Sequence, residues 1–303
     1  MTEKLPKLGL LLLVGLSVAW GINWPFMKIV LQEVPLWTFR AWSCIAAGLM
    51  LLALARLAGV KVMPLRHEWP SIAIAAIFNV LLWHVFIAVG VMKMASGHAS
   101  VLAFTMPVWS AIISVVFLGE RMSARVAAAL ALGIGGIIVL LSRDFSVVGD
   151  SPIGAAFVLG AAAGWAIGTL YQKRQKWTVG SLAVAGWQLT LGALPMFLVL
   201  PFVEGVLAPS ASLAAWAAAT YTTVVALVFA YFAWFKIVTL FPASLAGIGT
   251  LLTPVIGMLA GAVVLGEPFG LREIAAMLLI GSSLVLVLII PALRPRPAAA
   301  VAE

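Results

Sequence analysis

Apolar runs long enough to cross a bilayer follow one another along almost the whole sequence, and only short segments with charge, proline or glycine separate them. About 20 apolar residues in a helix span the hydrocarbon core, and lipid forces backbone groups to pair internally, which favours helices. Of the 303 residues, 64% are hydrophobic and 9% are charged. An ordinary soluble domain has about a quarter charged residues, so this composition excludes a water-soluble fold.

The short breaks divide the chain into ten predicted transmembrane helices. The connections between them are too short to hold a soluble domain. We therefore expect an integral membrane protein that is all-α and consists almost entirely of these spans. The predicted helices cover residues 8–30, 35–56, 69–91, 96–118, 123–142, 151–172, 179–202, 212–235, 243–265 and 271–291.

The two halves of the sequence resemble each other. Leu118-Gly-Glu120 and Leu265-Gly-Glu267 each close an apolar span, and Pro107 and Pro254 precede them at matching positions. Five helices is an odd number, so two such repeats would enter the membrane in opposite orientations, as in transporters that work by alternating access. The expected parts are a first five-helix repeat at 1–147, a second, inverted repeat at 148–293 and a cytoplasmic tail at 294–303.

The net charge of +8 comes from short basic clusters between the apolar spans. Such clusters are typical of topology signals and not of a surface that binds nucleic acid. With the N-terminus in the cytoplasm, all basic residues fall on the cytoplasmic side except Lys28, Arg40, Lys93, Arg143 and Arg272. We therefore expect a multi-pass protein of a bacterial cytoplasmic (inner) membrane, with both termini cytoplasmic and an uncleaved first helix.

All ten acidic residues fall in predicted loops or at the ends of spans. Proton-driven pumps commonly use carboxylates within the membrane, and exporters of cations need a buried negative charge. The lack of acidic residues inside the spans favours a facilitator or exchanger of net-neutral solutes. Glu120 and Glu267 each precede a predicted helix whose dipole favours a carboxylate, so we assign them a structural role.

The sequence indicates no cofactor, no catalytic group and no metal site. Cys44 is the single cysteine and lies in an apolar span, where its expected role is packing. His67 and His98 lie at span ends, away from His84, so the histidines do not suggest a metal cluster. An enzyme acting within the membrane would need clustered carboxylates, histidines or an activated nucleophile, and no such cluster is visible.

The candidate binding residues are polar or aromatic side chains inside the spans. His84 follows Trp83 in the third span and would hydrogen-bond a substrate or sense pH, or else be satisfied by a neighbouring helix. Asn23 and Trp24 precede Pro25, which removes a backbone hydrogen bond from the first helix. The Asn23 amide would contact substrate or join two helices.

Other mid-span aromatic residues would either line an uncharged cavity or pack against neighbouring helices. They are Trp83, Trp109, Trp165, Phe104 and Tyr231. Pro25, Pro107 and Pro254 are candidate kinks or hinges, because proline interrupts the hydrogen bonds of a helix.

Ten spans, Arg40 early in the second span, and a proline followed by Leu-Gly-Glu in both halves resemble the drug/metabolite transporter (DMT) superfamily, EamA family. The resemblance covers essentially the whole chain. The stretch from Trp20 to Pro25 and the pair Trp83-His84 are similar to YddG-type amino-acid exporters. This resemblance implies a cavity lined by the first, third, fourth, sixth, eighth and ninth helices. The implied wall positions are Trp83, His84, Phe104, Met106, Trp165 and Thr250.

The sequence departs from a symmetric site in one respect. The second half has Gly168-Thr-Leu170 where the first half has Asn23-Trp-Pro25, so the binding features need not be mirrored.

These features together predict export of neutral or aromatic amino acids and related metabolites by alternating access through a central, uncharged, aromatic-rich cavity. The expected partners are a small-molecule substrate and the lipid bilayer, with no nucleic acid, and the expected state is a monomer. An aromatic cavity would also accept amphipathic drugs, so multidrug efflux is the alternative.

Overall fold

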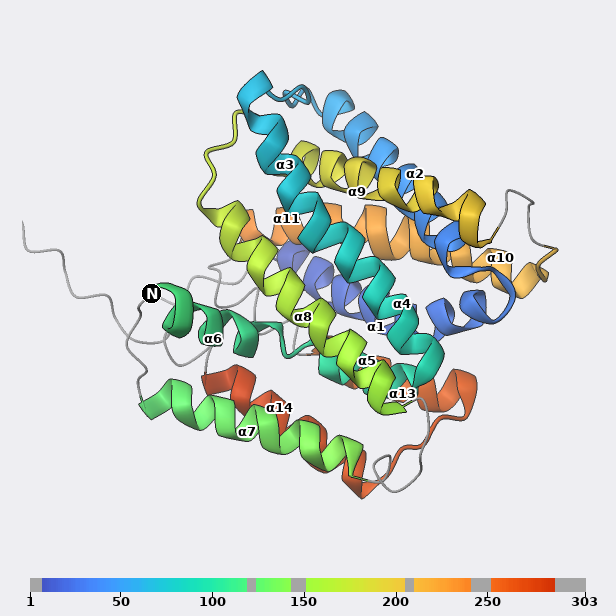
Figure 1. Ribbon diagram of the computed structural model, residues 1–303, viewed down its shortest axis with the longest axis vertical. Coiled ribbons are helices and arrows are strands. Elements are labelled where there is room, and N and C mark those ends of the chain that lie inside the picture. The colour runs from blue at the N-terminus through green and yellow to red at the C-terminus, as the bar shows by residue number, and fades with distance from the viewer. Residues whose placement is uncertain (1–6, 119–123, 143–150, 205–209, 241–251, 287–303) are drawn as a thin grey trace, which may run out of the picture.

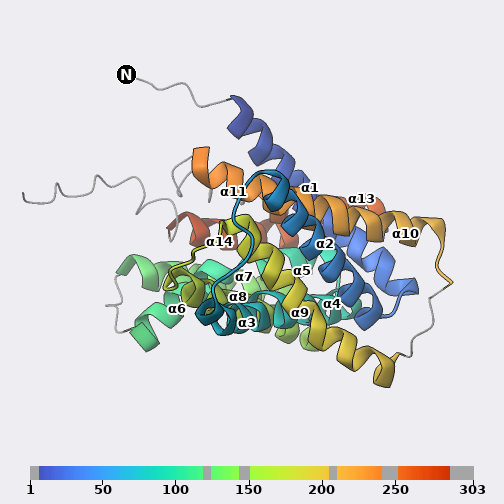
Figure 2. The ribbon, with the colours of Figure 1, turned by 90° about the horizontal axis from the view of Figure 1, so that it is seen from above.

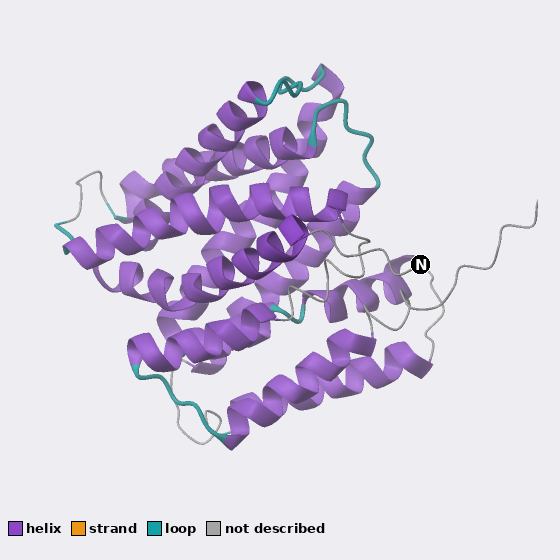
Figure 3. Cartoon of the chain, turned by 180° about the vertical axis from the view of Figure 1, so that it is seen from behind, coloured by secondary structure: helices purple, strands orange, loops and turns teal. Residues whose placement is uncertain are grey.

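The computed structural model describes residues 7–118, 124–142, 151–204, 210–240 and 252–286, and its regular elements there are all helices (Figure 3). This confirms the predicted all-α fold. η1 is a 3-10 helix, and η2 and η3 are π-helices. The elements are α1 (Lys7–Glu33), α2 (Leu36–Leu57), η1 (Arg66–Glu68), α3 (Trp69–Ala76), η2 (Ile77–Leu82), α4 (Trp83–Lys93), α5 (Ser96–Ala103), α6 (Met106–Leu118), α7 (Ala124–Leu141), α8 (Ser151–Lys173), α9 (Ser181–Val203), α10 (Leu213–Thr220), η3 (Tyr221–Phe229), α11 (Ala230–Leu240), α13 (Leu252–Leu265) and α14 (Leu271–Leu284).

Six of the described helical stretches are long and apolar enough to cross a membrane, and two shorter apolar helices accompany them. Most predicted spans begin and end within a few residues of the described helices. The span predicted at 212–235 continues as far as Leu240, and the one at 243–265 is described only from Leu252 onward, where it is helical.

The span predicted at 96–118 is interrupted. α5 ends at Ala103 and α6 begins at Met106, with Phe104 and Thr105 in a turn between them. Pro107 is the second residue of α6, and a proline is tolerated in a first helical turn because the N–H that it lacks would have no partner there. The fourth span is therefore two short helices in succession.

Each of the main helix pairs joins an element from before residue 142 to one from after residue 151: α2 with α9, α1 with α13, α4 with α8, and α7 with α14 (Figure 1). α2 and α9 run antiparallel, because Glu204 at the end of α9 accepts from the backbone N–H groups of Trp37 and Thr38 at the start of α2, at 2.9 and 2.8 Å. At the other end of the pair, Lys61 lies 3.3 Å from the hydroxyl of Thr178.

α7 and α14 form a pair at the edge of the bundle. They lie side by side along one border in Figure 1, and Figure 2 also shows them together. The Ser283 hydroxyl donates to the carbonyl of Ala129 at 2.6 Å across this pair. Both helices make only slight contact with the remaining helices that the structure describes.

Every acidic residue in the described part of the chain accepts hydrogen bonds from backbone N–H groups at or near a helix start. The Glu33 carboxylate, for example, accepts from the backbone and the hydroxyl of Ser212, the N-cap of α10, at 2.6 and 2.7 Å. Negative charge is favoured at a helix N-terminus. All of these carboxylates except that of Glu273, which accepts from the start of its own helix, join segments that are far apart in sequence. The residues are Glu33, Glu68, Glu204, Glu267 and Glu273.

Glu267 has the expected helix-terminus role but at an unexpected helix. It accepts from Ser96 and Gly97 at the start of α5 and not from α14, the next helix in the chain. The start of α14 is instead capped by Glu273, which accepts from the Gly270 N–H at 2.8 Å. Glu120, the matching residue of the first half, lies outside the described residues.

Candidate functional site

Trp83 and Trp165, two of the predicted wall residues, are brought together by the packing of α4 against α8. Their ring centroids are 4.8 Å apart with an interplanar angle of 54°, within the range of favourable aromatic pairs. Trp83 is the first residue of α4, directly after the π-helix η2. π-helical turns are frequent at functional sites, since they re-aim the side chains that follow.

His84 is buried, with 4% of its surface exposed. Its Nδ1 atom lies 2.9 Å from the carbonyl oxygen of Val80, one turn earlier in the same helical span. The histidine is thus satisfied by its own span and not by a neighbouring helix. Because Nδ1 is engaged by Val80, the other ring nitrogen, Nε2, is the atom through which His84 would meet a substrate.

Arg40 was missed as a site residue, although an arginine inside an apolar span is itself a signal of function. It lies five residues into α2 and is 2% exposed. Its guanidinium contacts the sulfur of Met27 and lies 4.8 Å from the centroid of the neighbouring Phe39 ring. Nε has no hydrogen-bond partner, and no described carboxylate pairs with the group.

Arg40 lies in the same region as His84 and Tyr231, two of the predicted site residues. It lies within electrostatic range of His84 and of the buried Cys44. Tyr231 packs against the cluster of apolar residues that contains Cys44. α2, α4 and α11 therefore gather a cation, an imidazole, a thiol and a phenol in one region between the two halves of the chain.

Asn23 also has an unsatisfied group. Its Oδ1 atom is buried and has no hydrogen-bond partner among the described residues. Asn23 and Met27 are four residues apart in α1, so they lie on the same helix face one turn apart. Asn23 is thus adjacent to the contact between Met27 and Arg40.

The remaining predicted residues take packing positions or lie outside the described part. Trp24 is 5% exposed and packs close to Gly257 of α13. Phe104 lies in the turn between α5 and α6 and packs against the same apolar cluster as Trp83. Met106 begins α6, Pro25 lies within the continuous α1, and Pro254 is buried near the start of α13. Thr250 lies outside the described residues.

A cluster of amides between three helices was not predicted, because a sequence does not show which polar side chains of different spans meet. The Asn79 Nδ2 group, in η2, donates to Oε1 of Gln172 and of Gln188, both at 3.2 Å. Gln188 in turn donates to Gln172 at 2.9 Å. The three amides hold α8 and α9 against the π-helix, as interhelical hydrogen bonds do in membranes.

The close approach of α8 to η2 at this cluster depends on Gly168. A Cβ at Gly168 would lie 2.0 Å from Asn79 Oδ1 and 2.9 Å from Phe78 Cβ. We expect Gly168→Ala to lower the thermal unfolding midpoint of the detergent-solubilised protein, with a loss of about 1–3 kcal/mol from overpacking. Gly164→Ala is the matched control, because its Cβ would meet no described atom of another helix closer than the Phe78 carbonyl oxygen, at 3.8 Å. Equal midpoints for the two variants would contradict the proposed crowding.

A second polar cluster joins the ends of several helices. Lys28 donates to the Glu267 carboxylate at 3.1 Å and to the Met94 carbonyl at 2.8 Å. The same carboxylate accepts from the backbone and hydroxyl of Ser96 and from the Gly97 N–H, at 2.6, 2.8 and 2.9 Å. Burial opposes ionisation, but these hydrogen bonds and the Lys28 charge outweigh it and hold the pKa of Glu267 below its ordinary value of 4.5.

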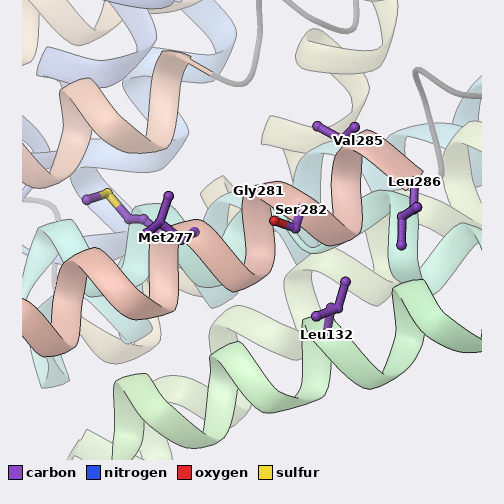
Figure 4. Close-up of a pocket in the computed structure, with 7 residues that line it drawn as sticks. Leu132, Met277, Gly281, Ser282, Val285 and Leu286 are labelled. Atoms are coloured by element: carbon purple, nitrogen blue, oxygen red, sulfur yellow. The ribbon is translucent and has the colours of Figure 1, made fainter.

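Two surface pockets are described, and no predicted site residue lines either of them. One, of about 440 Å³, lies between α7 and α14 (Figure 4). The other, of about 650 Å³, is a largely apolar groove between α2, α9 and α10. The region around Arg40 and His84 is instead packed, which leaves Met27 in contact with the guanidinium.

The sequence model of the EamA-like transporter family matches residues 7–142 and 152–289 of the chain. An uncharacterized transporter of Bacillus subtilis (strain 168), YvbV, is 32% identical over 94% of this chain and 93% of its own length. The uncharacterized inner membrane transporter YedA of Escherichia coli (strain K12) is 28% identical over 94% of this chain and 91% of its own length. A solved crystal structure shares the fold, with a TM-score of 0.66 at 20% identity over 92% of this chain and 95% of that chain.

Proposed function

Because the chain belongs to the EamA-like transporter family, we propose that it exports neutral and aromatic amino acids and related metabolites by alternating access, as a facilitator or exchanger. Membership makes it a multi-pass membrane transporter with the ten-helix fold of the drug/metabolite transporter superfamily. The observation that carries the proposal is the position of the acidic side chains. Each described acidic residue is bound at a helix start, and the interior around Trp83, His84 and Trp165 holds no described acidic group.

The arrangement of helix pairs supports alternating access between two inverted repeats. The family model matches each half separately, and α2 and α9, which correspond to each other, pack antiparallel. The π-helices η2 and η3 lie in corresponding spans of the two halves. Trp20 of α1 donates to the Ala226 carbonyl within η3 at 3.0 Å, and Trp165 of α8 packs on Trp83 next to η2. A two-fold relation between the repeats would generate these paired contacts.

The proposal includes the location of the protein. Basic residues between the spans favour cytoplasmic termini, and the relative YedA is named as an inner membrane transporter. We place the chain in a bacterial cytoplasmic membrane, with Lys28 and Glu267 at the end that faces away from the cytoplasm. A single copy contains both halves of the site, which is consistent with a monomer.

Uptake into proteoliposomes tests the proposal. Radiolabelled phenylalanine, threonine and methionine are offered first without any ion gradient and then with an imposed proton gradient. Saturable equilibration of these amino acids without a gradient is the expected result. No flux in either condition, despite folded protein, would overturn the amino-acid assignment and favour efflux of amphipathic drugs.

A variant of His84 tests whether the region around it takes part in transport. We expect His84→Ala to lower the initial rate of phenylalanine uptake by about tenfold, the effect of losing one well-placed hydrogen bond. His67→Ala is the matched control, since His67 is exposed at the start of the third span. Equal uptake rates for wild type and both variants would show that His84 takes no part in transport.

A further inference from the structure

Arg40 is a permanently charged group in a place that lacks a counter-charge. The guanidinium stays protonated at any physiological pH, and buried charges in proteins are normally paired. Arg40 is 2% exposed, Nε is without a partner, and no described carboxylate reaches it. A buried charge of this kind is costly, which points to an anionic group that joins it only when the protein is loaded.

The present contacts of Arg40 are ones that a ligand would readily replace. A thioether sulfur is a weak hydrogen-bond acceptor, and methionine is unbranched and adaptable. The guanidinium matches a carboxylate through two parallel hydrogen bonds, far stronger than its contact with Met27. A carboxylate is therefore the chemical group that this position would select.

Asn23 offers a complementary acceptor on the same side. Its Oδ1 atom is buried without a partner, one helical turn of about 5.4 Å from Met27. Pro25 has no N–H, so the carbonyl of Gly21 also lacks its usual intrahelical donor. These acceptors suit an ammonium group, which donates only, and Asn23 lies one helical turn from Met27, the residue that Arg40 contacts.

We propose that Arg40 binds the carboxylate of the transported substrate while Asn23 accepts a hydrogen bond from its ammonium group. This inference rests on the proposed transport function and narrows it to molecules that carry a carboxylate. Zwitterionic amino acids satisfy both positions. Cationic amphipaths are rejected, because a second positive charge beside Arg40 in a medium of low dielectric is strongly unfavourable.

The test compares substrates that differ in one charged group. Binding of L-phenylalanine, L-phenylalaninamide and 3-phenylpropionate is measured by tryptophan fluorescence, and flux by proteoliposome uptake. The variants are Arg40→Met, Arg40→Lys and Asn23→Ala, with Arg56→Met as the control because Arg56 is exposed near the other end of α2.

We expect Arg40→Met to weaken phenylalanine binding by about 30-fold and Arg40→Lys by about tenfold, since lysine keeps the charge but not the bidentate geometry. The wild type should bind phenylalaninamide poorly, and Arg40→Met should not weaken that binding further. Asn23→Ala should weaken phenylalanine binding but leave 3-phenylpropionate unaffected. Arg56→Met should match the wild type throughout.

The thermal unfolding midpoint separates a binding role from a structural one. Replacing an uncompensated buried charge with methionine should leave the ligand-free protein as stable as the wild type or more so. A marked fall in the midpoint of Arg40→Met would assign Arg40 a structural role and overturn the inference. So would phenylalanine affinity within about twofold of the wild type, since that is less than one hydrogen bond contributes.

The two proposals fail in different ways. If amino acids bind and cross the membrane equally well in wild type and Arg40→Met, the proposed function stands and the role of Arg40 is overturned. If the wild type binds no amino acid but binds 3-phenylpropionate in a manner that requires Arg40, the amino-acid assignment fails and the carboxylate site stands. If folded wild type binds none of the carboxylates, the inference is wrong.

Discussion

Glu267→Ala is expected to lower the free energy of unfolding by about 3 kcal/mol, the lower end of the cost of breaking a buried ion pair, because the side chain of its partner Lys28 is 24% exposed. The carboxylate accepts hydrogen bonds from Lys28, Ser96 and Gly97, and its side chain is 8% exposed. Without it, Lys28 keeps only the Met94 carbonyl, and the start of α5 loses its cap. Unfolding in mixed detergent micelles measures the change.

Glu267→Gln is the matched comparison for this variant. The amide keeps the shape and one carbonyl acceptor but has no charge, so its loss of stability should fall between those of wild type and alanine. A difference of less than about 1 kcal/mol between wild type and Glu267→Ala, the size of an exposed ion pair, would show that the cluster does not stabilise the fold.

The same carboxylate makes stability depend on pH. Because the pKa of Glu267 in the folded protein lies below its ordinary value of 4.5, the ionised form stabilises the fold above that pH. This contribution is lost as the pH falls from 4.5 through the lower folded pKa. The thermal midpoint of the wild type should therefore exceed that of Glu267→Gln near neutral pH, and the difference should shrink in acid. A difference that does not change with pH would contradict this assignment.

Gly48→Val is expected to separate α2 from α9 and to cost about 3 kcal/mol or more, at the upper end of overpacking effects. A Cβ at Gly48 would lie 2.5 Å from Thr190 Oγ1 and 2.8 Å from both the Gly186 carbonyl oxygen and the Thr190 backbone nitrogen. Backbone atoms cannot turn away as a side chain can, so the helices themselves must move apart. Yield of folded protein and the unfolding free energy measure the effect.

Gly135→Val provides the control for this substitution. Gly135 lies within α7, and apart from the backbone of its own helix no atom of the described residues lies within 4 Å of an ideal Cβ there. Both variants place the same side chain in the middle of a membrane helix, so the difference between them reports the contact between α2 and α9. Comparable stability of the two variants would show that this contact tolerates a side chain.

The positions of the helices could be predicted from the sequence because the bilayer imposes a length and a polarity that each span must meet alone. The third predicted span, at 69–91, corresponds to α3, η2 and α4 together, and the seventh, at 179–202, to α9. Hydropathy does not report hydrogen-bond register, so the π-helix within the third span was not foreseen. The interruption at Phe104 and Thr105 was foreseen only as a kink near Pro107.

The candidate site was predicted in part. Trp83 and Trp165 were both named as candidate wall residues, and the structure brings their rings together from the two halves of the chain. Their roles, and that of His84, stay predictions. Arg40 was noted only as a basic residue and as part of a family resemblance, because the sequence does not show whether a charge near a span end reaches water or is buried.

The sequence by itself determined that the chain crosses a membrane as helices, since apolar length and internal backbone pairing are properties of each segment. It also determined that acidic groups lie in loops or at the ends of spans. Only the tertiary structure decided which groups meet: Glu267 caps α5, whose first residue is 171 positions away, and Asn79 bonds to amides of two other helices. The physical reason is that hydrogen bonds and ion pairs between helices depend on how the helices pack, and many packings satisfy the same hydropathy.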